Sequence, residues 1–280
     1  MFTSIAIDLG GTNVRVARIT NGIIEQKVVE ICHAAGTKEE CIDQLYNLVK
    51  KVFTPNVEGI GIGVPSVVDH DRGIVYNVQN IPSWDFVPLK DLMEARFHVH
   101  TEVDNDVNCY VLGEKNFGAG RPYQDFVGIT IGTGVGAGVF IDGNLYRGIN
   151  TGAGEIGCLP YLNANYEYYC SSHWMKSKGV DAEHISRSAA DGDPGALLIW
   201  KEFGYHLGKL MQAVLFAYDP EAIVIGGGIA GGAAYFKDAM MTSMAEAFPY
   251  TKELEQIKIL FSDLVNCNLL GASILCNVHC

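Results

Sequence analysis

The sequence predicts an α/β protein built from two related lobes, and three observations carry this prediction. First, 280 residues with 48% hydrophobic and 19% charged side chains are enough for one large or two ordinary domains. Second, two segments in which strand-like stretches alternate with turns recur 121 residues apart. Third, the 32 glycines gather in clusters at the ends of expected strands, which places backbone close to a ligand rather than in a flexible linker.

The first of the two segments, Ser4–Glu30, has the pattern of short strands joined by turns. Val14 and Val16 keep an apolar face, and Asn21-Gly22 is a strong hairpin turn. Periodicity and length then predict four further elements in this half. They are a helix over Thr37–Phe53, a buried strand over Gly59–Val64, a strand over His98–Val103 and a helix starting in Val107–Glu114.

The second segment, Phe126–Tyr146, repeats the organisation of the first. Either two turn-rich hairpins match by chance, or a lobe with a phosphate-facing hairpin is duplicated. The offset of 121 residues places Gly132-Thr133 on Gly11-Thr12 and Asp142-Gly143 on Asn21-Gly22.

No Pro/Ser-rich linker separates the two halves, so ordered structure should join them, with a boundary near Glu114–Arg121. Helical and strand-like stretches continue to the end of the chain. They predict helices over Ala196–Tyr218, Tyr235–Phe248 and Leu269–Val278, and a strand over Ala222–Ile225.

Charge and cysteine usage limit the classes of function. The net charge of -12 and the pI near 5.0 repel phosphodiester backbones, which disfavours nucleic acid as a partner. No apolar run reaches the roughly 18 residues that span a bilayer, and no signal segment precedes the first strand, so no membrane partner is expected. The eight cysteines are scattered, as reduced thiols of a cytoplasmic protein would be.

Three glycine clusters suggest a nucleotide site. In the turn Asp8-Leu9-Gly10-Gly11-Thr12, glycines let backbone N–H groups approach phosphate oxygens, although a plain tight turn is the alternative. A strand follows this turn and no Lys accompanies it, so it is neither a Walker loop nor a dinucleotide-binding fingerprint. Asp8 suits Mg²⁺, directly or through water, unless it only caps the turn. The other two clusters are Gly132-Thr133-Gly134 and Gly226-Gly227-Gly228.

Asp106 is the candidate catalytic residue, in the segment Asp104-Asn105-Asp106 between an expected strand and helix. Phosphoryl transfer to an alcohol needs a carboxylate that aligns the hydroxyl and accepts its proton. A carboxylate at a helix N-terminus stays ionised beside the positive end of the dipole, which suits orientation and late proton acceptance. Asn105 offers a donor and acceptors to sugar hydroxyls. The alternative is that Asp104 or Asp106 simply caps the helix.

Seven stretches, in order along the chain, match a known pattern. They are IAIDLGGTNVRVA, GIGVPSVVD with NVQNIPSW, DNDVNCYVLGE, GITIGTGVGAGVFIDGNLYRG, GAGEIG, DPEAIVIGGGI and LLGASIL. Together they cover nearly the whole chain, which resembles the ROK family of sugar kinases and sugar-responsive regulators. The resemblance implies the two-lobed actin-like ATPase (ribonuclease H-like) fold with an interlobe cleft.

The resemblance also implies a domain division and a set of ligands. Residues 1–117 would form a small N-terminal lobe, joined by a C-terminal helix at 268–280, and residues 118–267 a larger lobe. The ligands would be ATP, Mg²⁺ and a hexose, and the protein would be a homodimer whose lobes close to exclude water.

By the same resemblance, site residues can be assigned by role. Asp106 is the general base, Asn105 and Glu155 hold sugar hydroxyls, and Ser66 and Asn80 lie near the sugar. The ATP site is formed by Asp8, Gly10, Gly11, Thr12, Gly132, Thr133, Gly226, Gly227 and Gly228.

The chain departs from the family at the zinc motif. Members with zinc carry Glu-x-Gly-His and then Cys-x-Cys-Gly-x-x-Gly-Cys-x-Glu, and here the His, which also touches the sugar, is Cys158. No clear counterpart of the downstream Glu is found. Cys158, Cys170 and His173 would give three irregularly spaced ligands without a fourth, so a metal-free loop packed by Tyr168, Tyr169 and Trp174 is expected. Trp174 could also stack on a sugar face.

Three functions remain open. The first is a hexose kinase that makes a sugar 6-phosphate, glucose being the first substrate to consider and N-acetylmannosamine the next. The second is a sugar-responsive repressor, which the acidic charge and the position of Asp8 so close to the start of the sequence disfavour. The third is a sugar-binding protein without catalysis, which the intact Asp106 and glycine turns disfavour.

Overall fold

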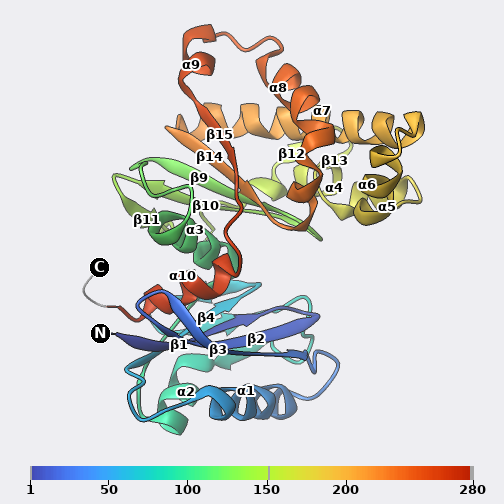
Figure 1. The fold of residues 1–280 in the computed structure, drawn as a ribbon. Helices are drawn as coiled ribbons and strands as arrows, with labels where there is room; N and C mark the ends of the chain where they lie inside the picture. Colours follow the sequence, from blue (N-terminus) through green and yellow to red (C-terminus); the bar gives the residue numbers. More distant parts are fainter. Residues whose placement is uncertain (1, 151, 278–280) are drawn as a thin grey trace. The chain divides into compact units, whose positions relative to one another are not determined.

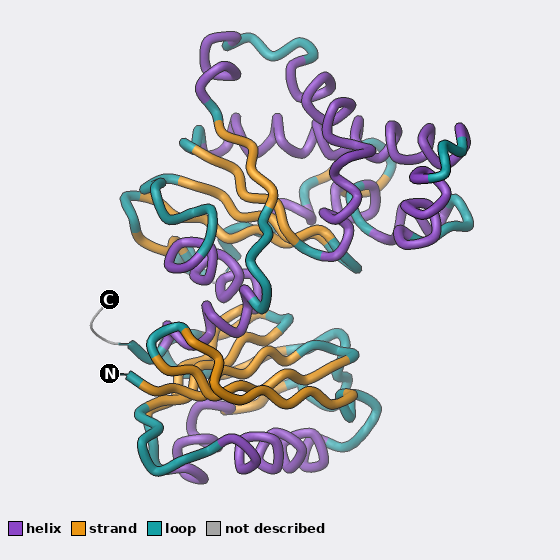
Figure 2. Tube along the Cα trace, viewed as in Figure 1, coloured by secondary structure: helices purple, strands orange, loops and turns teal. Residues whose placement is uncertain are grey.

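The computed structural model describes residues 2–150 and 152–277, which form two compact units. Unit 1 contains the residues up to Arg121, the segment Arg147–Ala153 and the chain from Leu264 onward. Unit 2 contains Pro122–Tyr146 and Gly154–Asp263. Each unit has a β-sheet with helices packed on it (Figures 1 and 2). Segment Arg147–Ala153 packs with unit 1, although the division made from the sequence puts it in the C-terminal lobe.

The main sheet of unit 1 has five strands in the order β3-β2-β1-β4-β8. The first three strands form an antiparallel meander, and β1, β4 and β8 run parallel. These strands are β1 (Thr3–Leu9), β2 (Asn13–Thr20), β3 (Ile23–Ile31), β4 (Gly59–Val64) and β8 (His100–Asn105). A small antiparallel sheet is formed by β5 (Val67–Asp69), β6 (Ile74–Tyr76) and β7 (Phe86–Pro88).

Helices cover both faces of the main sheet of unit 1. Alternation along β1 explains this, because Ile5 and Ile7 enter the core shared with α1 while Ala6 enters the core shared with α3 and α10. Thr37 and Glu40 form a capping box at the start of α1. The helices are α1 (Lys38–Val52), α2 (Leu89–Phe97), α3 (Asp106–Phe117) and α10 (Cys267–Leu275). The expected end of the last helix, Val278, lies outside the described residues.

The main sheet of unit 2 has the strand order β11-β10-β9-β14-β15, with the same directions as in unit 1. The predicted repeat of strand and hairpin organisation is therefore confirmed. The two-residue turns also match, since Asn21-Gly22 and Asp142-Gly143 all have positive φ. The strands are β9 (Phe126–Ile131), β10 (Val135–Ile141), β11 (Asn144–Tyr146), β14 (Ala222–Gly226) and β15 (Lys258–Phe261).

The glycine turns of the two sheets differ in length by one residue. Pairing ends at Leu9 and Val14 in unit 1 and at Ile131 and Val135 in unit 2. The second strands, β2 and β10, therefore correspond at an offset of 121 residues, as Val14 and Val135 do. The first strands, β1 and β9, correspond at an offset of 122 residues, as Leu9 and Ile131 do.

A helical layer buries one face of the unit 2 sheet, with Trp200, Phe203 and Phe236 at its centre. A two-stranded sheet and several short helices surround it. These elements are η1 (Ile156–Cys158), β12 (Pro160–Tyr161), β13 (Ala164–Asn165), α4 (Tyr166–Tyr169), α5 (Ser172–Ser177), α6 (Ala182–Ala190), α7 (Pro194–Tyr218), η2 (Gly228–Gly232), α8 (Ala233–Ala245) and α9 (Thr251–Gln256).

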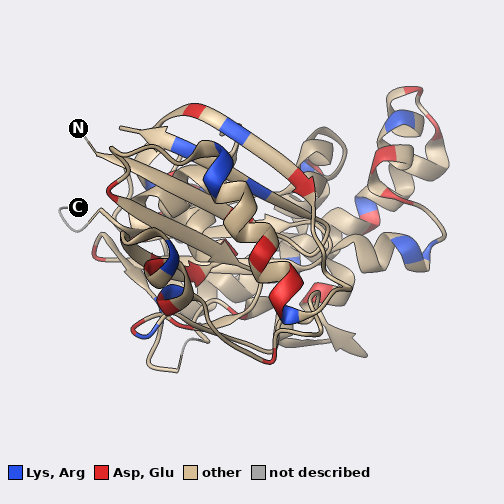
Figure 3. Cartoon of the chain, turned by 90° about the horizontal axis from the view of Figure 1, so that it is seen from below, with Lys and Arg blue, Asp and Glu red and all other residues tan. Residues whose placement is uncertain are grey.

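Two further findings concern the charges and the helices as a whole. Acidic and basic residues are interspersed, for example along β3 (Figure 3).

Among residues 2–150 and 152–277, no helix is both long and apolar enough to cross a membrane.

Candidate functional site

The candidate residues of unit 1 meet at the carboxyl ends of β1, β4 and β8. Asp8, only 7% exposed, lies at the end of β1 opposite Arg15 of β2. The Arg15 guanidinium donates from Nη1 to Asp8 Oδ2 at 2.6 Å. The turn itself is closed by the Gly10 amide, which donates to the Asn13 carbonyl at 2.9 Å. Asp8 is thus held by an ion pair rather than acting as the turn cap.

Asn80 lies directly against the β1–β2 turn. A Cβ added to Gly11 would overlap the Asn80 side chain, so the turn and the residue predicted to lie near the sugar approach each other closely. Ser66 lies after β4, where its hydroxyl donates to the Tyr76 carbonyl. The structure therefore brings these three predicted residues into one unit.

The junction between β8 and α3 is capped by Asn105. Its Oδ1 accepts from the Val107 amide at 2.8 Å, and its Nδ2 donates to the Ser66 carbonyl at 3.2 Å. The alternative that Asp104 or Asp106 caps this helix is therefore wrong. An amide group has further donor and acceptor capacity, so Asn105 retains one N–H and one lone pair for a ligand.

Asp106 is the first residue of α3, and its backbone is tightly surrounded. Its Cα lies 3.5 Å from the position of a Cβ on Gly63 in β4. Its carbonyl accepts from Asn268 Nδ2 of α10 at 3.4 Å. Since Asn105 supplies the cap, the Asp106 carboxylate is not required for that role.

The glycine clusters of unit 2 also lie side by side. Gly227 has a φ of 90°, and a Cβ there would overlap the carbonyl of Ile131 at the end of β9. By contrast, a Cβ on Gly132 or on Gly228 would meet nothing within 4 Å. Gly227 is thus required by packing, while Gly132 and Gly228 leave space beside their Cα atoms. The Gly132 amide itself donates to the Gly134 carbonyl at 3.0 Å.

Glu155, Cys158 and Glu167 form a polar group near the β9–β10 turn. Cys158 is exposed and its thiol donates to Glu155 Oε2 at 3.8 Å. Partial burial and these two carboxylates raise the pKa of the Cys158 thiol. Glu167 Oε2 accepts from the Val135 amide at 3.1 Å and lies 2.5 Å from a Cβ built on Gly134.

Glu167 is the residue that the sequence reasoning missed, since it found no counterpart for the downstream Glu. The structure places this carboxylate beside Gly157 and Cys158. The signal was present in the sequence, because Glu167 is the one acidic residue between Glu155 and Asp181.

The three residues considered as zinc ligands do not come together. Cys170 is completely buried, whereas Cys158 and His173 are exposed. In the part of the chain that the structure describes, no three His, Cys, Asp or Glu side chains are grouped to hold a metal ion. The residues present therefore do not fit the zinc site of the family.

Aromatic rings pack the loop where zinc would be expected. Tyr161 stacks on Tyr166 with centroids 4.4 Å apart and meets Tyr169 edge-on at 5.3 Å. His206 of α7 also contacts Tyr161. The Tyr161 hydroxyl and His206 Nδ1 share a hydrogen bond of 3.2 Å. Trp174 is 3% exposed, so it belongs to the core and offers no face to a sugar. The predicted packing by Tyr169 and Trp174 is confirmed, and Tyr168, although 39% exposed, meets Tyr169 edge-on at 5.1 Å. The centre of the cluster, Tyr161 with His206, was not foreseen.

Two sheets of one topology, each with a glycine turn between its first two strands, define the class of actin-like ATPases. The sequence model of the ROK family matches residues 4–278, so the chain belongs to the ROK family. It is 32% identical over 258 residues to a glucokinase of Thermotoga maritima, a match that covers 80% of this chain and 81% of that protein.

Two other relatives define the range of the family. A xylose repressor of Caldicellulosiruptor bescii is 34% identical over 245 residues, which cover 75% of this chain and 60% of the repressor. A crystal structure of a ROK family glucokinase from Streptomyces griseus, in complex with glucose and AMPPNP, has a TM-score of 0.83 at 26% identity and covers 98% of both chains. The predicted fold class and family are thereby confirmed.

Proposed function

We propose that this chain is an ATP-dependent hexose kinase in which Asp106 is the general base. The observation that carries the proposal is the β8–α3 junction, where Asn105 caps the helix and Asp106 opens it. A carboxylate at this position would orient the acceptor hydroxyl and accept its proton as the bond to phosphorus forms. The glucokinases among the relatives support the same activity.

The nucleotide would be held by the glycine turns of both units. The space beside Gly132 and Gly228 supports this, because a phosphate group can approach backbone that no side chain covers. Mg²⁺, when bound, neutralises charge on the transferred phosphoryl group. The ion pair with Arg15 uses Oδ2 of Asp8, so Oδ1 is the oxygen with which Asp8 would hold the cation or its water. Gly10, Gly11, Thr12, Thr133, Gly134, Gly226 and Gly227 complete the proposed nucleotide site.

The sugar would be held by Asn105, Glu155, Ser66 and Asn80, with Cys158 in place of the family's His. Glu167 adds a second carboxylate for sugar hydroxyls, which restores a contact that the zinc-motif comparison seemed to remove. A site that hydrogen-bonds hydroxyl groups discriminates strongly among sugars. We propose glucose as first substrate, phosphorylated at its 6-hydroxyl, with N-acetylmannosamine as the alternative.

A second candidate is a sugar-responsive regulator that binds a sugar without phosphorylating it. The xylose repressor among the relatives favours this candidate. We further propose a cytoplasmic homodimer, which light scattering on the purified protein would test.

The decisive experiment is an ADP-release assay over a panel of hexoses with wild type and Asp106→Ala. The wild type is expected to phosphorylate at least one hexose. The variant should keep its fold and nucleotide affinity while turnover falls at least ~100-fold, the scale of losing a general base. Sugar binding without ADP release by the wild type would instead favour the regulator, and equal turnover in both proteins would refute the role of Asp106.

A further inference from the structure

Asp104 is a buried carboxylate immediately before the proposed sugar-binding and catalytic residues. It lies at the end of β8, and its side chain is 4% exposed. Three donors converge on it: the Asn105 amide at 2.8 Å, Asn108 Nδ2 at 2.7 Å and Arg147 Nε at 2.7 Å. A buried carboxylate held by a charged partner and two neutral donors has little freedom to move.

Two of these donors determine the local geometry of the junction. The Asn105 amide belongs to the cap residue itself, and Asn108 belongs to the first turn of α3. Because both bonds end on one Asp104 oxygen, Oδ1, they link the last residues of β8 to the first turn of the helix. Asp106 lies between the two donors along the chain.

The third donor comes from a different part of the chain. Arg147 follows β11 of unit 2, yet segment Arg147–Ala153 packs with unit 1. Its guanidinium, 30% exposed, binds the other Asp104 oxygen, Oδ2. The same segment continues directly into Gly154 and Glu155.

We propose that Asp104 and Arg147 are positioning residues for phosphoryl transfer, in that their ion pair holds Asp106 in its reactive orientation and anchors the segment that leads to Glu155. This inference rests on the proposed function. Arg147 would act through its bond to Asp104, on the orientation of the catalytic carboxylate. A displacement of about 1 Å at a reacting group can cost ~100-fold in rate.

The alternative is that Arg147 only neutralises a buried charge. Removing one partner of a buried pair is destabilising because an uncompensated charge remains, whereas replacing both partners by neutral groups is often tolerated. A double variant, Asp104→Asn with Arg147→Met, therefore separates the two roles. The double variant removes the buried charge of Asp104 together with its partner Arg147, but it also removes the ion pair that would hold the segment leading to Glu155.

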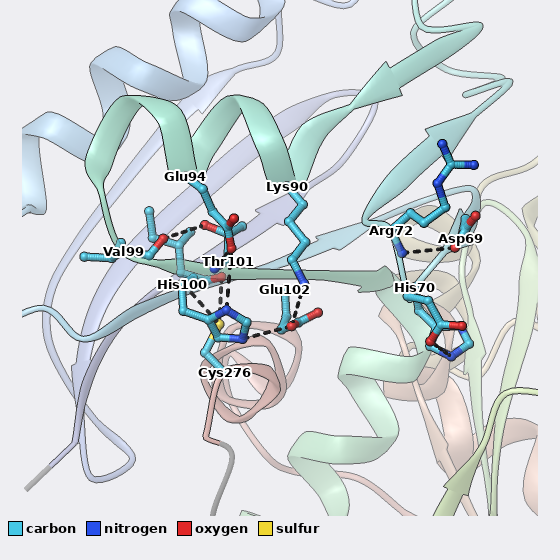
Figure 4. Close-up of polar contacts among 12 residues, drawn as sticks. Asp69, His70, Arg72, Lys90, Glu94, Val99, His100, Thr101, Glu102 and Cys276 are labelled. Carbon is cyan, nitrogen blue, oxygen red and sulfur yellow. Dashed lines mark hydrogen bonds and ion pairs between the residues drawn. The ribbon is translucent and has the colours of Figure 1, made fainter.

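A cavity beside the pair offers a sharper test. It measures about 300 Å³ and is lined by His70, Lys90, Glu102, Asp104, Arg147 and Leu275. Figure 4 shows Lys90 of α2 paired with Glu102 of β8 and His70 in the nearby turn. The cavity is large enough for a free guanidinium ion to approach Asp104 once the Arg147 side chain is removed.

The experiment compares wild type, Arg147→Ala, Arg147→Lys and the double variant in the hexose kinase assay. Arg147→Ala should lose about 100-fold in kcat while the KM for ATP changes little. Dilute guanidinium chloride should restore about tenfold of that loss in Arg147→Ala, and Arg147→Lys should fall between Arg147→Ala and wild type. The double variant should fold and remain slow.

Controls isolate the effect from general charge loss and from denaturation. Arg187→Ala removes an exposed helix pair with Glu183 and should match wild type, with or without guanidinium. Thermal melting of each variant shows whether it is folded. Amide hydrogen exchange at residues 104–108 should be faster in Arg147→Ala than in wild type, a measurement that needs no substrate.

The outcomes are separable. A wild type without activity on any hexose would sink the proposed function, and hydrogen exchange would still test the anchor. Wild-type kcat in Arg147→Ala, full activity in the double variant, or unchanged exchange at residues 104–108 would each overturn the positioning role.

Discussion

The two glycine hairpins share a topology but differ in what surrounds them. In unit 1 the turn is flanked by the Asp8–Arg15 ion pair and packed by Asn80. In unit 2 the residues at the corresponding strand positions are Thr130 and Gly136, which carry no charge. The charged groups at the two turns therefore come from different places: from the paired strands in unit 1, and from Glu167, outside the hairpin, in unit 2.

The same contrast extends beyond the turns. In unit 1, ion pairs hold the carboxylates at the ends of β1 and β8, Asp8 through Arg15 and Asp104 through Arg147. Unit 2 fixes the loop after Glu155 with stacked rings centred on Tyr161 and His206. Ion pairs thus fix the strand ends of unit 1, and ring packing fixes the loop of unit 2.

The largest effect on stability is expected in unit 2 at Gly227, where the backbone lies close to the Ile131 carbonyl. Gly227→Ala forces a side chain into a positive-φ position and against the Ile131 carbonyl, so it should lower the free energy of unfolding by about 2–5 kcal/mol. Urea unfolding measures this change. Gly228→Ala is the matched control, since a Cβ there meets nothing within 4 Å, and its stability should equal that of wild type. Equal stability of the two variants would contradict the packing described here.

The next largest effect is expected on turnover, when the charge of Asp8 beside the unit 1 turn is removed. Asp8→Asn should lower turnover about 100-fold, because it weakens the hold on the cation that would neutralise charge on the transferred phosphoryl group. Thr130→Val alters the corresponding strand position of unit 2 and should leave turnover near the wild-type value. An ADP-release assay on both variants decides, and comparable losses would mean that the two turns do not differ in role.

A third pair of variants compares the two turns at equivalent positions. Gly11→Ala should cost about 1–3 kcal/mol of stability, because the new methyl group overlaps Asn80. Gly132→Ala should leave stability unchanged but raise the KM for ATP, because its methyl group would cover open backbone in the proposed nucleotide site. Urea unfolding and initial rates at varied ATP separate the two effects. A loss of stability in Gly132→Ala as large as that in Gly11→Ala would contradict the expected difference between the two turns.

Much of the fold could be predicted because its signals are local. Apolar periodicity predicted helix α1, and an apolar run of strand length predicted β4. The Thr37–Glu40 capping box of α1 is a further local signal, which the prediction did not use. The duplicated hairpins followed from two turn dipeptides at one spacing. These features depend on neighbours in the sequence, so they can be read without knowledge of the packing.

The organisation of the candidate site could be predicted only in part. The strand-end positions of Asp8 and Asp106 were foreseen, and their chemical roles stay predictions. Arg147 lies 43 residues from its partner Asp104, and His206 lies 45 residues from Tyr161. No local pattern encodes such pairings, because they depend on how distant elements pack.

The smallest effect is expected for the pH dependence of stability, in the aromatic cluster of Tyr161, Tyr166, Tyr169 and His206 in unit 2. His206 is partly buried, and burial lowers its pKa, with Lys178 acting in the same direction and Glu202 opposing it. The unfolded chain, with a His pKa of about 6.5, then takes up the proton before the folded protein does. This contribution to stability is therefore complete above about pH 6.5 and is lost as the pH falls below that value. His206→Phe keeps a ring in the cluster without a titrating group, so its free energy of unfolding should fall less than that of wild type between neutral and mildly acidic pH. Urea unfolding of both proteins across that range measures the difference, and identical slopes would mean that the cluster does not keep His206 neutral.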